Sequence, residues 1–273
     1  MNLDNLIKIL VLIIILLAIC TLALLAAWGV VAIVQSDSTT TITQQQQTQT
    51  ETNDLPTNST VDTSAVLAQS ADMGQDYIDS MIFLGDSTTY HMINRAVLSG
   101  GKNTKQVWSG ASGSLTLDGM IHKTTIVYPK TGTEMTIAEA VAQEKPAYMV
   151  ITLGVNGVAY ATETQFKAYY GKLIDAIHTA NPDTKIILQS IFPVSAAYDQ
   201  KGGKLCNATI DTANGWVMQL AADKGCKYLD TQSVLKDANG TMIASYDAGD
   251  GVHMTAEAYK QILQYIRTHG YTE

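Results

Sequence analysis

Short apolar runs alternate with helical stripes of apolar residues in the C-terminal part of this chain. Met81–Leu84 is an unbroken apolar run before Gly85 and Asp86, which is typical of a strand buried on both faces. Residues 162–177 repeat apolar positions every three or four residues, between a capping box at Thr162 and the stop signal Asn181-Pro182, so they predict a helix. The predicted strands are Met81–Leu84, Gln106–Trp108, Tyr148–Leu153, Lys185–Leu188 and Lys227–Leu229.

Further helical stripes complete a regular alternation of strands and helices. Apolar positions in 210–221 and 259–266 predict two more helices, the second beginning at Thr255. Five buried strands alternating with helices predict an α/β fold, a three-layer α/β/α sandwich with a five-stranded parallel sheet. Residues 124–128 and 133–136 flank a Pro- and Gly-containing turn, and we expect them to form a β-hairpin before a helix at 137–143.

The N-terminal region has a different pattern. Ile9 to Val34 carries no charged side chain, and as a helix it would be about 39 Å long, enough to span a bilayer with some tilt. Secretory signals have a shorter apolar core and a small-residue cleavage site, so residues 1–35 are predicted to be an uncleaved membrane anchor, with a cleaved signal as the alternative. Because Lys8 precedes the run and the next cation is Arg95, a cytoplasmic N-terminus and an extracytoplasmic domain are predicted.

Composition divides the rest of the chain in two. Residues 36–75 are rich in Ser, Thr and Gln, cannot bury enough surface to offset their ordering entropy, and are predicted to form a disordered linker before a globular domain at 76–273. The net charge of −8, without a basic patch, argues against a nucleic-acid partner.

No cluster of Cys and His has metal-ligand spacing, so neither a metal nor another cofactor is predicted. Cys206 and Cys226 lie at opposite ends of a predicted helix and are expected to be free thiols.

Polar residues follow several of the predicted strands, at the sheet edge where open parallel sheets bind ligands. Ser87 lies where a helix begins. The first backbone amides of a helix have no partner within it and can donate hydrogen bonds to a reaction oxyanion. Ser87 is therefore a candidate nucleophile, provided that a histidine and a carboxylate lie close enough to activate it. Asp250 and His253 precede the last helix and are the candidate partners. Structural roles are the alternatives: Ser87 as a helix cap, Asn156 as a cap, Gly113 as a turn residue and His253 as a surface side chain.

Four blocks in this order make the chain similar to the SGNH (GDSL-type) hydrolase family, named for a Ser, a Gly, an Asn and a His. They are Gly85-Asp86-Ser87, Gly113 within 111–114 (with Gly110 as a second match), Asn156 within 154–157, and Asp250-Gly251-Val252-His253. The resemblance implies a flavodoxin-like sheet with Ser87 as nucleophile, His253 as general base and Asp250 as the carboxylate that orients it. It also implies an oxyanion hole made by the Ser87 and Gly113 amides and the Asn156 side chain.

Two positions depart from the family pattern, and the substrate stays open. Gly157 stands where the family often has Asp, and Thr88 where it often has Leu. His91, one helical turn after Ser87, is expected to be a pocket or surface residue. The resemblance and the predicted anchor indicate a serine esterase that hydrolyses O-acyl, foremost O-acetyl, esters of carbohydrate or cell-envelope glycan, with possible cell-wall association. The alternatives are an O-acetyltransferase working with a membrane partner, a lipase or thioesterase, and a non-catalytic glycan-binding module.

Overall fold

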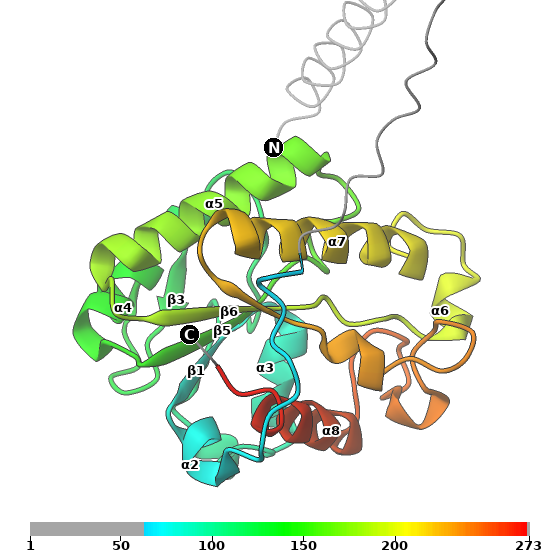
Figure 1. Cartoon of the computed structure of the whole chain (residues 1–273), viewed down its shortest axis with the longest axis horizontal. Coiled ribbons are helices and arrows are strands. Elements are labelled where there is room, and N and C mark those ends of the chain that lie inside the picture. Colours follow the sequence, from blue (N-terminus) through cyan, green and yellow to red (C-terminus); the bar gives the residue numbers. More distant parts are fainter. Residues whose placement is uncertain (1–62, 272–273) are drawn as a thin grey trace, which may run out of the picture. The chain divides into compact units, whose positions relative to one another are not determined.

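A parallel sheet forms the centre of the structure, a computed structural model that describes residues 63–271. Its strand order is β2-β1-β5-β6-β7, and every neighbouring pair is parallel (Figure 1). The five predicted strands and the parallel sheet are therefore confirmed. The strands are β1 (Met81–Gly85), β2 (Val107–Trp108), β5 (Tyr148–Thr152), β6 (Lys185–Gln189) and β7 (Lys227–Leu229).

Helices cover both faces of the sheet, because alternate side chains of each buried strand point to opposite sides. Ile82 and Leu84 of β1 belong to the core beneath α4, α5 and α7, whereas Met81 and Phe83 pack with α2, α3 and α8 (Figure 1). The predicted three-layer arrangement follows. The helices are α2 (Gly74–Asp79), α3 (Ser87–Asn94), α4 (Ile137–Glu144), α5 (Glu163–Ala180), α6 (Ala196–Asp199), α7 (Asn207–Asp223) and α8 (Ala256–Arg267).

The chain between β2 and β5 contains the predicted hairpin. Strands β3 (Thr125–Val127) and β4 (Glu134–Thr136) pair in antiparallel fashion, and Thr136 then opens α4 through a capping box with Glu139. The capping box predicted at Thr162 opens α5, which ends at Ala180 before Asn181. Single turns of 3₁₀ helix complete the domain at η1 (Gly101–Asn103), η2 (Ile121–Lys123), η3 (Thr231–Val234) and η4 (Ala244–Tyr246).

The segment that precedes α2 lies on the domain, which corrects the predicted linker boundary at residue 75. Ala65 and Leu67 are buried, and Val66 forms a parallel bridge with Tyr228 of β7. The Leu67 amide donates to the Tyr228 carbonyl and the Tyr228 amide donates to the Ala65 carbonyl, each over 2.8 Å. The prediction was wrong for residues 63–75 because the edge of β7 offers unpaired backbone groups, which residues 65–67 satisfy. Further along, the amides of Ser70 and Met73 donate to carbonyl groups at the end of α8.

Three other predictions concern the membrane anchor, the cysteines and metal binding. Within residues 63–271 no helix combines the length and apolar character needed to cross a bilayer, and the predicted anchor at 1–35 lies outside this range. In the same range Cys226 is a buried free thiol and Cys206 a half-buried one, and burial raises the pKa of Cys226 to about 12. No group of three or more His, Cys, Asp or Glu residues in this range is placed to hold a metal ion.

Candidate active site

The turn between β1 and α3 is built so that Ser87 begins a helix without capping it. A β-carbon on Gly85 would overlap Thr89 Oγ1 and the Thr152 carbonyl oxygen, so only glycine fits this tight turn. Asp86 is the N-cap: its Oδ1 accepts hydrogen bonds from the Thr88 amide (3.0 Å) and the Thr88 hydroxyl (2.6 Å). The capping alternative for Ser87 is therefore wrong, and its hydroxyl is available for another partner.

Ser87, His253 and Asp250 form a hydrogen-bonded chain. His253 Nε2 lies 2.9 Å from Ser87 Oγ, and His253 Nδ1 lies 2.6 Å from Asp250 Oδ2. The other oxygen of Asp250 accepts from the backbone amides of Val252 (2.9 Å) and His253 (2.8 Å), so the loop holds its own carboxylate in place. The structure thus brings together residues 166 positions apart in the sequence, as the resemblance implied.

The electrostatic surroundings keep Asp250 ionised. Partial burial opposes its ionisation, but the hydrogen bonds from the His253 side chain and from the His253 and Val252 amides outweigh burial and lower the pKa of Asp250 to about 2. An ionised Asp250 accepts a hydrogen bond from Nδ1–H and so favours the tautomer with a lone pair on Nε2. That lone pair faces the hydroxyl of Ser87, which is the arrangement a general base needs.

Helix α3 contributes His91, which was expected to be a pocket or surface residue, and its C-cap contributes Arg95, which was not predicted to take part. The His91 ring stacks on the His253 ring, with centroids 4.0 Å apart and planes 14° apart. Arg95 Nε donates a 3.0 Å hydrogen bond to the carbonyl oxygen of Met254, the residue after His253. Ser87, His91 and Arg95 are spaced four residues apart and therefore share one face of α3. This four-residue spacing is the feature of the sequence from which their place beside Ser87 could have been predicted.

His91 is held in its neutral form by its position. Burial, followed by the charges of His253 and Arg95, lowers the pKa of His91, against an opposing effect of Asp250. Its Nδ1 is buried and has no hydrogen-bond partner within residues 63–271. The ring thus packs on His253 as a flat surface, and no group of the described residues is placed to exchange a proton with its Nδ1.

The predicted oxyanion donors are only partly in position. The Ser87 amide is at the start of α3, where helix amides have no intrahelical acceptor, and it has no acceptor among the described residues. The Gly113 amide instead donates to the Gly110 carbonyl over 2.8 Å. The Asn156 side-chain amide donates to Ser114 Oγ (2.9 Å) and to the Leu115 carbonyl (3.2 Å). Asn156 therefore reaches the loop of Gly113, but its N–H groups are engaged there.

Of the two candidate glycines, Gly113 lies against the nucleophile helix. Its φ of +74° favours glycine, and a β-carbon there would be 2.9 Å from the ring of Tyr90 on α3. A β-carbon on Gly110 would instead overlap the Ser114 carbonyl oxygen. Both glycines are thus required by the turn, and Gly113 is the one that brings the turn close to the first turns of α3.

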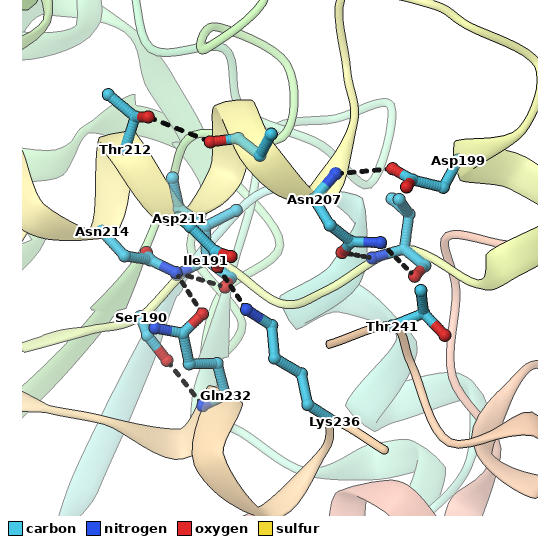
Figure 2. A network of polar contacts seen from close by, with 12 residues as sticks. Ser190, Ile191, Asp199, Asn207, Asp211, Thr212, Asn214, Gln232, Lys236 and Thr241 are labelled. Carbon is cyan, nitrogen blue, oxygen red and sulfur yellow. Dashed lines mark hydrogen bonds and ion pairs between the residues drawn. The ribbon is translucent and has the colours of Figure 1, made fainter. Parts of the chain in front are cut away.

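Two buried asparagines of α7 hold the loop after β6. Asn214 Oδ1 accepts from the Ile191 amide (2.7 Å) and its Nδ2 donates to the Ile191 carbonyl (3.0 Å). Asn207 makes the same pair of bonds to Val194, both 3.0 Å long (Figure 2). The Ser195 amide, next in the loop, donates to the Gly251 carbonyl over 2.9 Å. The network of Figure 2 therefore holds the loop after β6, which in turn bonds to the loop of Asp250 and His253 through Ser195 and Gly251.

Residues 83–261 match the model of a family described as the GDSL-like Lipase/Acylhydrolase family. The search of curated proteins found no match. Solved structures with a similar backbone include a GDSL-like lipase from Bacteroides thetaiotaomicron (17% identity, 68% of this chain, 85% of that chain, TM-score 0.49). An acetylxylan esterase variant from Geobacillus stearothermophilus is another (20% identity, 76% and 98% coverage, TM-score 0.42).

Proposed function

The chain belongs to the GDSL-like lipase/acylhydrolase family, and on that premise we propose that it is a serine esterase that hydrolyses O-acyl, foremost O-acetyl, esters of carbohydrate or cell-envelope glycan. The observation that carries the proposal is the hydrogen-bonded chain from Ser87 through His253 to Asp250, with contacts of 2.9 and 2.6 Å. A hydroxyl, an imidazole and an ionised carboxylate in this order are the parts of a nucleophilic triad.

The first half of the proposed reaction transfers the acyl group to the protein. Ser87 Oγ attacks the ester carbonyl carbon while His253 Nε2 takes the hydroxyl proton, and Asp250 stabilises the imidazolium that results. The tetrahedral oxyanion lies at the start of α3, where the free amide of Ser87 donates to it. Asn156, whose side chain is exposed, exchanges its bond to Ser114 Oγ for one to the oxyanion and keeps its bond to the Leu115 carbonyl. Collapse breaks the ester C–O bond, and His253 returns the proton to the leaving sugar oxygen.

The second half frees the acyl group. A water molecule gives a proton to His253 Nε2 and its oxygen attacks the acyl carbon on Ser87. The second tetrahedral intermediate releases Ser87 Oγ, which recovers the proton from His253, and the carboxylic acid leaves. Each step uses the same base and the same oxyanion donors, so no further reactant than water is needed.

Surface chemistry supports a carbohydrate ester over a long-chain lipid. A lipase has to accommodate an acyl chain on exposed apolar surface. Within the described residues the large apolar side chains that are exposed are Met73, Met120 and Tyr160, and only Tyr160 lines the pocket beside Asn156. We also propose, on the sequence alone, that residues 1–35 anchor the domain on the outer face of a membrane.

The test compares the full chain in detergent with Ser87→Ala. Release of p-nitrophenol from p-nitrophenyl acetate should fall by at least about 10³-fold in the variant, because removing a triad nucleophile eliminates the acyl-enzyme route. Circular dichroism checks the fold, and Ser99→Ala serves as a matched exposed serine. Equal turnover by wild type and Ser87→Ala would exclude the serine mechanism.

Substrate class is tested separately. A preference for acetate over octanoate esters is expected, and the reverse would favour a lipase. Mass spectrometry of an acetylated glycan should show loss of acetyl groups with release of acetate. Appearance of acetyl groups on an added oligosaccharide acceptor would instead indicate a transferase.

A further inference from the structure

A pocket of about 260 Å³ opens beside Asn156, between the loop after β2 and the loop after β5. Its walls include Thr116 and Asp118 from the first loop, and Gly157 and Tyr160 from the second. Strand β1, which leads to Ser87, lies between β2 and β5 in the sheet. The strand order reverses at β1, and this is the point at which such sheets bind ligands. The pocket is therefore on the substrate side of Ser87.

The two loops are held together, so the pocket is a fixed feature of the domain. The Asn156 side-chain amide bonds Ser114 Oγ and the Leu115 carbonyl across the gap. A β-carbon on Gly157 would lie 2.8 Å from the Leu117 carbonyl oxygen, which is too close for any other residue. The glycine that departs from the family pattern at this position thus permits the close approach of the two loops.

Tyr160 is the feature of the pocket that most needs an explanation. Its side chain is 83% exposed, more than the other exposed large apolar side chains, Met73 and Met120, within the described residues. The Lys204 ammonium lies 5.6 Å from the centroid of its ring. Lys204 therefore lies near one face of the ring, and the other flat apolar face is available for the C–H face of a sugar ring to cover.

Polar atoms with spare capacity surround that ring. Asp118 Oδ1 accepts from the Met120 amide (2.7 Å), and no bond to its Oδ2 is made within residues 63–271. Gln165 uses Oε1 for the amide and hydroxyl of Thr162, and its Nε2 makes no bond in the same part of the chain. A carboxylate oxygen and an amide N–H together match sugar hydroxyls, which both donate and accept.

We propose that this pocket is a sugar subsite that binds a neutral sugar ring next to the acylated residue of an oligosaccharide, with Tyr160 as the stacking surface. The proposal rests on the esterase function proposed above. Asp118 is the charged residue of the lining, and the Lys204 ammonium lies 5.6 Å from the centroid of the Tyr160 ring, so the site has one charge of each sign. The two charges offset each other, which fits a neutral sugar ring.

Another pocket of the described domain, larger than the one beside Asn156, does not compete for this role. It measures about 380 Å³ and is lined by residues such as Asp79, Lys105 and Glu144. Met81 and Ala147, at the starts of β1 and β5, belong to its wall, so it lies at the opposite edge of the sheet from Ser87.

Kinetics with two substrates test the subsite on the full chain in detergent. For an acetylated xylo-oligosaccharide, Tyr160→Ala should lower kcat/KM about tenfold more than it does for p-nitrophenyl acetate, mostly through KM, because only the oligosaccharide reaches the pocket. Tyr160→Phe should retain the preference, since the ring face is kept. Met120→Ala, a neighbouring exposed apolar side chain outside the lining, is the matched control and should behave as wild type.

The outcomes separate the subsite from the esterase function. If wild type hydrolyses p-nitrophenyl acetate but Tyr160→Ala lowers both substrates equally or neither, the subsite is overturned and the esterase stands. Calorimetry with the deacetylated xylo-oligosaccharide on Ser87→Ala tests the pocket without any hydrolysis. Adding Tyr160→Ala should weaken binding about tenfold, and unchanged binding would overturn the subsite. Tighter binding of an oligogalacturonate than of the neutral chain would overturn the assignment of a neutral sugar.

Discussion

The imidazole of His91 stacks on the imidazole of His253, with centroids 4.0 Å apart and 14° between the ring planes. Because His91 and Ser87 share one face of α3, the helix that presents the nucleophile also supports the base. Arg95, one turn further, secures the backbone after His253 through the Met254 carbonyl. Movement of α3 would therefore shift nucleophile and base together.

Loss of the stacking ring should reduce activity without removing it. For His91→Ala we expect kcat/KM to fall about 3- to 10-fold, because an aromatic contact of this kind is worth about 0.5–1.5 kcal/mol. His91→Phe keeps a flat ring and should recover most of the rate. A steady-state comparison with p-nitrophenyl acetate measures both, and failure of Phe to do better than Ala would contradict the positioning role.

Acid should destabilise the protein partly through His91. Burial and the charges of His253 and Arg95 lower the folded-state pKa of His91, with Asp250 opposing. The unfolded chain takes up this proton near pH 6.5, so below that pH the unfolded state binds more protons and the free energy of unfolding falls. His91→Phe lacks this contribution and should lose less stability between pH 7 and pH 5. Denaturant unfolding at both pH values measures it, and parallel losses in the two proteins would refute it.

Removing the charge of Asp250 should reduce the catalytic rate far more than removing the His91 ring. Asp250→Asn is expected to lower kcat by on the order of 10²–10⁴-fold, because an amide at this position no longer favours the tautomer with a lone pair facing Ser87. Since the pKa of Asp250 is about 2, its protonation should add no second step to the pH–rate profile above about pH 4. Asp237→Asn, an exposed carboxylate in another loop, is the control. Activity close to wild type in Asp250→Asn would contradict its role.

Two glycines with the same backbone conformation provide a matched test of the contact between the Gly113 turn and α3. Gly113 has φ +74° and would carry a β-carbon 2.9 Å from the Tyr90 ring, whereas Gly132 has φ +75° and open space around it. Alanine at 132 should cost about 1–2 kcal/mol of unfolding free energy from backbone strain alone. Alanine at 113 should cost more and also reduce activity, because the ring of Tyr90 has to move. Denaturant unfolding measures the stability of both variants. Equal losses of unfolding free energy would show that the contact between Gly113 and Tyr90 is unimportant.

The asparagine network behind the site should be important for stability. Asn214→Ala leaves the buried amide and carbonyl of Ile191 without partners, and the loss of unfolding free energy is expected to be about 2–5 kcal/mol. Asn239→Ala, an exposed turn residue, should change stability by less than about 1 kcal/mol. Thermal or denaturant unfolding measures the stability of both variants. A loss for Asn214→Ala as small as that for Asn239→Ala would mean that water replaces the bonds.

Local patterns account for most of the elements. Five apolar runs correspond to five strands, and the capping box at Thr162 marks the first turn of α5. The hairpin at 125–136 was readable from its turn residues. Residues 63–75 were not, because their place depends on the free edge of β7, a distant partner that no local composition reveals.

The candidate site was predictable as a set of residues but less so as a geometry. Ser87, Asp250 and His253 come together as the ordered blocks implied. The sequence did not reveal that Asp86 caps α3, that His91 stacks on His253, or that Asn156 turns toward Ser114. These depend on rotamers and loop paths, which are settled by the neighbours that each side chain meets after folding.

By itself, the sequence determined the alternation of buried strands and amphipathic helices, and the order of the four blocks, because periodicity and turn chemistry are local properties of the chain. Only the tertiary structure decided the strand order, the pairing of 65–67 with β7, and which side chains contact His253. The physical reason is separation: Ser87 and His253 meet across 166 residues, and such contacts are selected by the packing of whole elements.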